Sequence, residues 1–191
     1  MADAPVTGRF APTPSGRLHL GNLFCALLAY LSARKAGGRF LLRIEDIDLP
    51  RCPARLARQA VEDLRWLGLD WDGEPLYQSR RTEIYERHLA MLSQKGLVYP
   101  CFCTRAQLHA SAAPNLGDTQ YVYGGACARL TREEAERLAL TRRPALRMRV
   151  PDEEVRFTDG LYGPQAENLA RDCGDFFLRR ADGVFAYQLA V

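Results

Sequence analysis

Residues 9–22, which read RFAPTPSGRLHLGN, hold the side chains best suited to chemistry. A proline-bearing turn leads here into an apolar helix, whose first backbone N–H groups lack partners and lie at the positive end of the helix dipole, where phosphate is favoured. His19 adds a donor, and Gly21 leaves space for a flat base beside the backbone. The stretch predicts a nucleoside triphosphate site without a Walker loop. The alternative is that His19 is an ordinary structural residue at a helix start.

Cysteine is the second residue type that could do chemistry, with six copies in the chain. Because the chain has no secretory signal, we do not expect a disulfide framework. Cys25 falls in the apolar helix and Cys173 beside a predicted strand, so we expect both to be buried as small hydrophobic side chains. Cys52 lies in a predicted loop. The cysteines that remain as candidate ligands are Cys101, Cys103 and Cys127.

The elements that position these residues alternate between strand and helix before residue 100. Gly37, Gly68 and Gly96 are placed to end three helices, and Ser79 can cap the third. This alternation implies a parallel sheet with right-handed crossovers. The predicted elements are a strand at Thr7–Ala11, a helix at Leu20–Lys35, a strand at Arg39–Ile44, a loop at Glu45–Cys52, and helices at 53–68 and 79–96.

The sequence pattern changes after about residue 100. Residues 131–134 form a capping-box pattern, and Ala181-Asp182-Gly183 is a hairpin turn signal. We expect residues 1–100 to form the first half of an α/β domain and residues 101–191 an insertion with a return toward it. The predicted elements are an irregular loop at Ser111–Gly125, a helix from Arg132 to Arg142, strands at Ala145–Val150 and Glu154–Asp159, and a hairpin of Asp175–Arg180 with Val184–Leu189.

Composition excludes few classes of protein. A length of 191 residues with 47% hydrophobic and 26% charged residues suits a globular protein of one domain or two small ones. The apolar run Leu23–Ala33 is far shorter than the ~20 residues of a membrane span. The N-terminus lacks a signal-peptide pattern. We therefore expect a cytoplasmic protein without a membrane partner, and a monomer.

The net charge of +3 does not identify a nucleic-acid binder. Lys35 and Lys95 are the two lysines, so 24 of the 26 basic residues are arginine. This skew favours a GC-rich coding sequence over an RNA-binding surface as its cause. Arginines also alternate with acidic residues along the predicted helices, as they do on solvated faces.

The motif at residues 9–16, followed by His19-Leu20-Gly21-Asn22, resembles the HIGH signature of class I aminoacyl-tRNA synthetases in its glutamate-type form. Within that family the likeness is greatest to the glutamyl-Q tRNA(Asp) synthetases, paralogues of the glutamyl-tRNA synthetase catalytic domain. It implies the first half of a Rossmann-like nucleotide-binding domain with an α+β zinc-bearing insertion. The further motifs that match are Leu42–Asp48, Tyr77–Ser79, Cys101–Cys103, Tyr123 with Cys127, and Ala186–Ala190.

The reaction implied by the resemblance is attack of a glutamate carboxylate on the α-phosphate of ATP, supplied with Mg²⁺, to give glutamyl-adenylate and pyrophosphate. The resemblance assigns catalysis to His19 and Asn22. It assigns ATP binding to Pro12, Gly16, His19, Gly21 and Asn22, and glutamate binding to Arg9, Phe10, Ala11, Pro12, Thr13, Glu45 and Tyr187. The alternative for Arg9 and for Glu45 is a surface ion pair or a solvated strand end, and the alternative for Tyr187 is a core position.

Cys101, Cys103, Tyr123 and Cys127 match the zinc site of the family residue by residue. Three thiolates and a phenolate oxygen can supply four tetrahedral ligands, and such a closed shell is structural rather than catalytic. Tyrosine is an unusual zinc ligand, so water in its place, or no fourth protein ligand, stays open.

The resemblance further implies transfer of glutamate to the queuosine base in the anticodon of tRNA(Asp). One alternative is a catalytic fragment of a glutamyl-tRNA synthetase, which would charge a tRNA 3′ end. A second is a zinc-stabilised RNA-binding module without activity. Sequence patterns of the common RNA-binding modules do not occur in the chain.

The C-terminal residues Tyr187–Val191 stop inside an apolar run. Relative to the family, the chain stops where the second half of the nucleotide-binding domain should begin. That half would carry the lysine-bearing KMSKS loop, and neither Lys35 nor Lys95 lies in such a context. We therefore expect the chain to be part of a longer protein and, in this form, to be weakly active at most.

Overall fold

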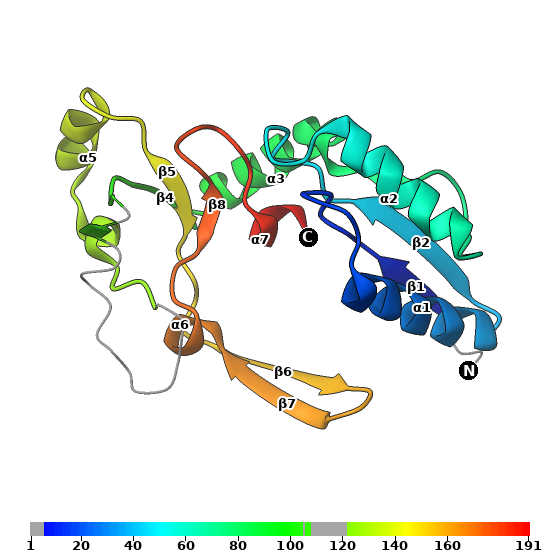
Figure 1. Ribbon diagram of the computed structural model, residues 1–191. Coiled ribbons are helices and arrows are strands. Elements are labelled where there is room, and N and C mark those ends of the chain that lie inside the picture. Colours follow the sequence, from blue (N-terminus) through cyan, green and yellow to red (C-terminus); the bar gives the residue numbers. More distant parts are fainter. Residues whose placement is uncertain (1–5, 105, 108–121) are drawn as a thin grey trace. The chain divides into compact units, whose positions relative to one another are not determined.

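The computed structural model describes residues 6–104, 106–107 and 122–191. The chain forms two compact units, residues 1–82 and 83–191, and each contains a three-stranded sheet (Figure 1). None of the helices in the described ranges has the length and apolar character needed to cross a lipid bilayer.

The first unit alternates strands and helices, as the sequence predicts. Its strands are parallel in the order β1-β2-β3, which confirms the predicted parallel sheet. The 3-10 turn η1 follows at Gln78–Arg80. The elements are β1 (Thr7–Phe10), α1 (Leu20–Lys35), β2 (Arg39–Ile44), α2 (Ala54–Trp66) and β3 (Leu76–Tyr77).

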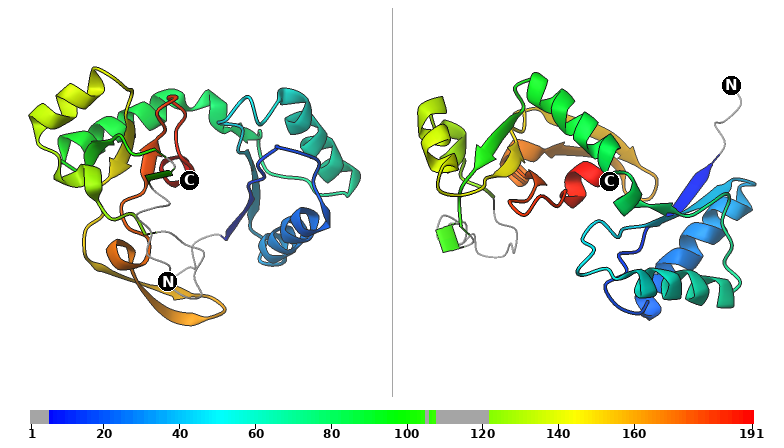
Figure 2. Two further views of the ribbon diagram at one scale, coloured as in Figure 1. Left: turned by 60° about the vertical axis from the view of Figure 1, so that its left-hand side comes forward. Right: turned by 90° about the horizontal axis from the view of Figure 1, so that it is seen from above.

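Both helices of this unit cover the same face of the sheet, as Figure 2 shows. The residues of β2 therefore alternate, with Phe40, Leu42 and Ile44 in the core below the helices. Close packing of α1 on β1 requires Gly8, because a Cβ there would lie 2.9 Å from the Cβ of Ala33. The first unit thus has one covered sheet face and one face free of its own helices.

Helix α1 is apolar on both sides but buries one side only. Ala26 and Ala33 pack into the core, whereas the outer side chains are 40–82% exposed. Such a helix is normally covered on both sides, and the first unit provides no such cover within its described residues. Cys25 is exposed, so the expectation that it is buried was wrong. The exposed outer side chains are Leu20, Phe24, Leu27, Leu28 and Leu31.

The second unit is α+β, with an antiparallel sheet in the order β4-β5-β8 and a two-stranded ribbon, β6-β7. Helix α3 (Thr82–Gln94) begins at the division between the units. The other elements are β4 (Val98–Cys101), η2 (Ala126–Arg129), α5 (Arg132–Ala139), β5 (Ala145–Met148), β6 (Glu154–Asp159), β7 (Gly163–Asn168), α6 (Leu169–Asp172), β8 (Phe177–Arg179) and α7 (Tyr187–Ala190).

Three predicted element ends were wrong by three residues or more. Ser79 does not cap α3, because it lies in η1 and its hydroxyl donates to Asp46 instead. The helix predicted to reach Arg142 ends at Ala139, since Pro144 follows closely and disfavours helix before it. The second hairpin strand is reduced to a single bridge of Phe185 with Arg179, because the chain turns into α7 after the Ala186 N–H donates to the Leu178 carbonyl.

The capping box at Thr131 and Glu134 is confirmed, since each side chain accepts from the backbone N–H of the other residue. Strands β3, β4 and β7 were not predicted. Strand β3 has two residues, and β7 reads GPQAEN, a composition that strands disfavour. Of the predicted loop at Ser111–Gly125, residues 111–121 lie outside the described ranges.

Asp72 ties the start of β2 to the end of α1. Its Oδ2 accepts from the Phe40 N–H and from the Arg34 guanidinium, each at 2.7 Å. The backbone amide of Phe40, followed by the Arg34 guanidinium, holds the pKa of Asp72 below its usual value. A lowered pKa in the folded state stabilises the fold above the unfolded pKa of about 3.9, and this contribution is lost as pH falls through the folded value.

We therefore expect Asp72→Asn to lower the free energy of unfolding at pH 7, with a difference from the unaltered protein that shrinks below about pH 4. Urea unfolding followed by the fluorescence of Trp66 and Trp71, both in the first unit, measures it. Glu74→Gln, a change of an exposed carboxylate in the same loop, is the control. A difference that stays constant from pH 7 to pH 3 would contradict the charge argument.

Candidate active site and metal centre

The first site lies at the carboxyl edge of the parallel sheet. Strands β1, β2 and β3 all end at this edge, and in open α/β sheets ligands bind there. The loop of residues 11–19 leaves β1 at this edge and enters α1, while Glu45 follows β2 directly. The structure therefore brings the predicted ATP-binding loop next to a predicted glutamate-binding residue.

Glu45 is the centre of this contact. Its backbone N–H donates to the Pro12 carbonyl at 2.9 Å, and the Thr13 hydroxyl donates to Oε2 at 3.3 Å. The Arg43 guanidinium donates to Oε1 at 2.7 Å. Glu45 is 7% exposed, yet a carboxylate can accept about four hydrogen bonds. The side chain therefore keeps acceptor capacity for a further cation.

Arg9 lies on the same sheet face as Arg43. In the β1–β2 register Arg9 is opposite Leu41. Arg43 is two residues after Leu41 on β2, and side chains two residues apart on a strand share a face. The Arg9 residue is exposed and forms no side-chain hydrogen bond or ion pair to any described residue. Its guanidinium is thus available to a ligand carboxylate. The side chain of Phe10 points into the core instead, so this residue can offer a ligand only its backbone.

His19 is the N-cap of α1, and its backbone N–H donates to Asn22 Oδ1 at 3.1 Å. The first turn holds no acidic side chain, so nothing there offsets the positive end of the helix dipole. The imidazole lies against Gly21, where a Cβ would come within 3.1 Å of His19 Cε1. Gly21 therefore accommodates the imidazole. Gly16 has open space around it.

Two polar contacts at this edge were not predicted. The buried Asp46 carboxylate accepts from the Ser79 N–H at 3.0 Å and from the Ser79 hydroxyl at 2.7 Å, which joins the loop after β2 to η1. Arg43 supports Glu45 from within a strand. An arginine inside a run of buried residues could have signalled a buried ion pair. Tyr187 belongs to the second unit and is 61% exposed.

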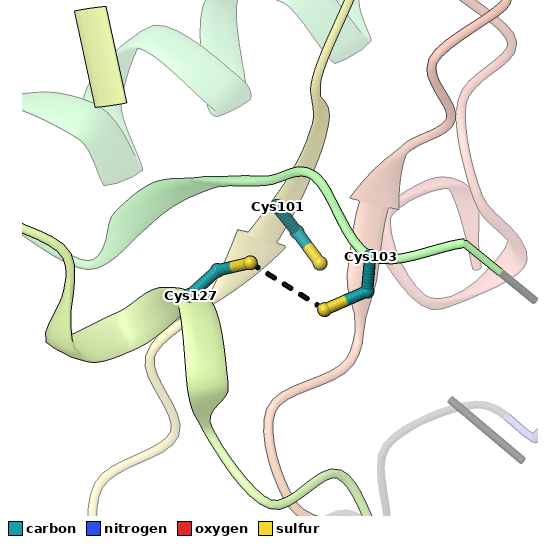
Figure 3. A group of neighbouring side chains, drawn as sticks. All are labelled: Cys101, Cys103 and Cys127. Atoms are coloured by element: carbon teal, nitrogen blue, oxygen red, sulfur yellow. Dashed lines mark hydrogen bonds between the residues drawn. The ribbon is translucent and has the colours of Figure 1, made fainter. Parts of the chain in front are cut away.

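The second site is a cysteine cluster in the second unit. Cys101 ends β4, Cys103 follows it, and Cys127 lies in η2. Figure 3 shows the three side chains pointing toward a common space, and their sulfur atoms lie within 4.8 Å of one another. All three are free thiols. A tetrahedral metal with bonds of about 2.3 Å places its sulfur ligands about 3.8 Å apart, so the cluster fits such an ion.

Tyr123 completes the cluster. Its hydroxyl oxygen lies 3.7 Å from Cys101 Sγ and 3.5 Å from Cys103 Sγ, and it accepts from the Cys127 N–H at 2.9 Å. Cys103 Sγ and Cys127 Sγ are 3.5 Å apart. The fold thus brings together the four side chains that the sequence selects, although Cys101 and Tyr123 are 22 positions apart.

Burial sets the acidity of these ligands. Desolvation raises the pKa of Cys103 to about 11 and also raises the pKa of the Tyr123 hydroxyl. Burial acts on Cys127 in the same direction, but hydrogen bonds from the Phe102 N–H and the Tyr123 hydroxyl outweigh it and lower its pKa. A bound cation would therefore have to displace protons from this site.

Comparison with known proteins gives the family of the chain. The family of class I tRNA synthetases for E and Q, catalytic domain, matches residues 5–191. The chain belongs to this family. It is 54% identical to the glutamyl-Q tRNA(Asp) synthetase of Symbiobacterium thermophilum over 96% of this chain and 60% of that protein. It is 50% identical to that of Nitratidesulfovibrio vulgaris over 97% of this chain and 60% of that protein.

Solved structures show the same fold at lower identity. A glutamate tRNA ligase from Elizabethkingia meningosepticum, crystallised with its amino acid, matches 98% of this chain and 41% of its own with a TM-score of 0.77 and 30% identity. The glutamate-tRNA synthetase of Elizabethkingia anophelis gives a TM-score of 0.79, again at 30% identity. The chain spans about 60% of the length of the curated glutamyl-Q relatives.

We expect Arg43→Met to lower the free energy of unfolding by roughly 3–5 kcal/mol, because it leaves the Glu45 carboxylate without its charged partner. The two side chains are 12% and 8% exposed. Arg17→Met is the matched control. Its ion pair with Asp63 is 70% and 23% exposed, so its loss should cost less than about 1 kcal/mol. Urea unfolding read by tryptophan fluorescence measures both, and equal losses would contradict the structural role of the Arg43–Glu45 pair.

Proposed function

We propose that the protein activates L-glutamate with ATP to glutamyl-adenylate and transfers the glutamate to the queuosine base in the anticodon of tRNA(Asp). The observation that carries activation is the position of Glu45, held against the proline-bearing loop at the carboxyl edge, with Arg9 on the same sheet face. The names of the relatives at 50–54% identity support the acceptor. We further propose that residues 1–100 form the first half of the catalytic domain and residues 101–191 the insertion.

The chemical difficulty of activation is charge, because a carboxylate must approach a polyphosphate and further negative charge develops in transit. Preorganised donors address this difficulty best. We assign the α-phosphate contact to His19 and to the free N–H groups that start α1, with Asn22 fixing the N-cap. Pro12, Gly16 and Gly21 shape the loop for the nucleotide. Mg²⁺ bound to ATP would offset part of the phosphate charge.

Recognition of glutamate requires an anion site and a cation site. Arg9 supplies a planar guanidinium for a carboxylate, and Glu45 accepts the α-ammonium. Thr13 holds Glu45 in place. Phe10, Ala11 and Pro12 are the further proposed glutamate contacts, and Phe10 can offer only its backbone. Tyr187 stays a predicted contact, as do the cytoplasmic location and the monomeric state of the protein.

The metal centre is proposed to hold a structural Zn²⁺. Thiolates favour Zn²⁺ over hard cations, and the ligands are Cys101, Cys103, Cys127 and the Tyr123 oxygen. Four protein ligands leave no open position for a substrate. Zinc would therefore stabilise the second unit and take no part in activation.

The second candidate function is charging of a tRNA 3′ end by a glutamyl-tRNA synthetase. The solved glutamate tRNA ligases that share the fold favour it, but their 30% identity is well below that of the glutamyl-Q relatives. A non-enzymatic RNA-binding module is the weakest alternative, because it would leave the Glu45 and His19 arrangement without use.

We expect the 191-residue chain to bind a non-hydrolysable glutamyl-adenylate analogue, and His19→Ala to weaken that binding by roughly tenfold or more, the loss of a hydrogen bond to a charged group. Isothermal titration calorimetry measures it. His88→Ala, a change of an exposed histidine on α3, is the control and should bind normally. Equal affinities of the two variants would remove His19 from the site.

The same preparation tests the acceptor. Glutamate-dependent exchange between ATP and pyrophosphate should proceed without tRNA but slowly, since no KMSKS-type loop occurs in the 191 residues. Labelled glutamate should accumulate on tRNA(Asp) that contains queuosine and not on the same tRNA without it. Label on tRNA(Glu) would favour the second candidate instead.

Metal analysis should find about one zinc per chain. Cys127→Ser should lose most of that zinc and lower the Tm of the second unit, because it removes one of the ligands. Cys25→Ser, at an exposed cysteine outside the cluster, should keep the zinc and the Tm. Zinc retained by Cys127→Ser, or absent from the unaltered chain, would contradict the ligand assignment.

A further inference from the structure

Arg147 is a buried charge that neither proposed site yet uses. It lies in β5, opposite Tyr99 in the β4–β5 register, and the residue is 4% exposed. A buried guanidinium is costly unless an anion compensates it and its N–H groups are hydrogen-bonded. The question is therefore which anion compensates Arg147.

Carboxylates do not supply that compensation. In the described part of the chain, the hydrogen bonds of Arg147 go to Cys101 Sγ and to a backbone carbonyl, and no ion pair joins it to an acidic side chain. The nearest acidic residue in contact is Asp175, and there Arg147 donates to the backbone carbonyl. The Asp175 carboxylate is already engaged, since it accepts from the Tyr99 hydroxyl at 2.5 Å and from the Val150 N–H at 2.9 Å.

The guanidinium instead faces the metal ligands. Its Nε donates to Cys101 Sγ at 3.3 Å. Its central carbon lies 3.8 Å from the ring centroid of Tyr123 and 3.7 Å from that of Phe177, so the planar group is sandwiched between two aromatic rings. Two of the four proposed ligands, Cys101 and Tyr123, are therefore in direct contact with one buried cation.

We propose that Arg147 is the counter-cation of the metal centre, a positioning residue that orients Cys101 and Tyr123 and balances the charge of the bound zinc–thiolate group. A zinc ion with three thiolates carries one net negative charge when Tyr123 stays protonated and two when it binds as a phenolate, and one guanidinium offsets one unit of this charge. The two rings hold the guanidinium plane, so Nε keeps its direction toward the sulfur. This inference rests on the zinc site proposed above.

The test compares Arg147→Gln, Arg147→Lys and the unaltered chain. Zinc affinity is measured by competition with a chromophoric chelator at one pH. Loss of a residue that orients a metal ligand typically costs about 10–100-fold in metal affinity, and we expect a loss of that size for Arg147→Gln. Arg147→Lys keeps the charge and should recover part of the affinity. Arg179→Gln is the matched control, because Arg179 lies in the same sheet but pairs with Glu86.

Thermal unfolding with and without zinc separates this role from packing. The increase in Tm on adding zinc should be smaller in Arg147→Gln. The pair of Arg147 with the negatively charged zinc–thiolate group exists only with metal bound, so the substitution removes it from the zinc-bound form alone. Equal decreases in Tm for both forms, with unchanged zinc affinity, would overturn the proposal in favour of a purely structural arginine.

A measurement on the unaltered chain covers the case in which Arg147→Gln does not fold. With ¹¹³Cd in place of zinc, an N–H···S hydrogen bond to a ligand thiolate transmits scalar coupling between the metal and the proton. We expect the Arg147 Nε proton to show this coupling in arginine-labelled protein. Metal binding without that coupling would overturn the role of Arg147, whereas failure to bind either metal would overturn the zinc site and this inference together.

Discussion

The parallel pairing of β1 with β2 is the constraint on which the first unit depends. Because both crossovers place their helices on one sheet face, the other face stays open to Arg9 and Arg43. Because both strands run in the same direction, the loop after β1 and the residue after β2 meet at one edge, where the Glu45 N–H donates to the Pro12 carbonyl. Sheet topology thus brings together residues 32 positions apart, Thr13 and Glu45, without any long-range motif.

Buried charges in both units are held by specific partners, and these partners mark the sites. Glu45 is paired with Arg43, and the Asp46 carboxylate is satisfied by Ser79. Arg147 faces a thiol and two aromatic rings. An isolated buried charge is unfavourable by several kcal/mol. Each of these charges is therefore stable in its place only if the interactions with its partners offset that desolvation free energy. At either site, the charged and polar groups that a ligand would meet are therefore already held in position by their partners before the ligand binds.

The sequence predicted the first unit well because its signals are local. Glycines that end helices, a proline at a first turn and alternation along β2 each act within a few residues, and α1 and β2 were predicted with the observed bounds. Ser79, the second hairpin strand and β7 were missed or misassigned because long-range partners decide them, such as Asp46 for Ser79. The four metal-site residues were selected by resemblance, and the structure brings them together. Arg43 carries one local signal, its place inside a run of buried residues, whereas Arg147 carries none, because a buried arginine reads like a surface one until its partners are known.

The make-up of the second core explains why a metal should matter to folding here and not to chemistry. The buried residues of that core cluster are Tyr99, Cys101, Phe102 and Cys127, so two of four are proposed metal ligands. Leu89, Leu178 and Phe185 are also buried in the second unit but lie outside this cluster, so apolar burial alone contributes little stability to the segment that holds Cys101 and Cys127. The energy of zinc binding, which in small zinc domains is about 10–16 kcal/mol, would then be an essential part of the folding energy. With three thiolates, a tyrosine oxygen and a buried guanidinium around it, the ion would have its coordination filled and its charge balanced, which leaves it no means to polarise a substrate.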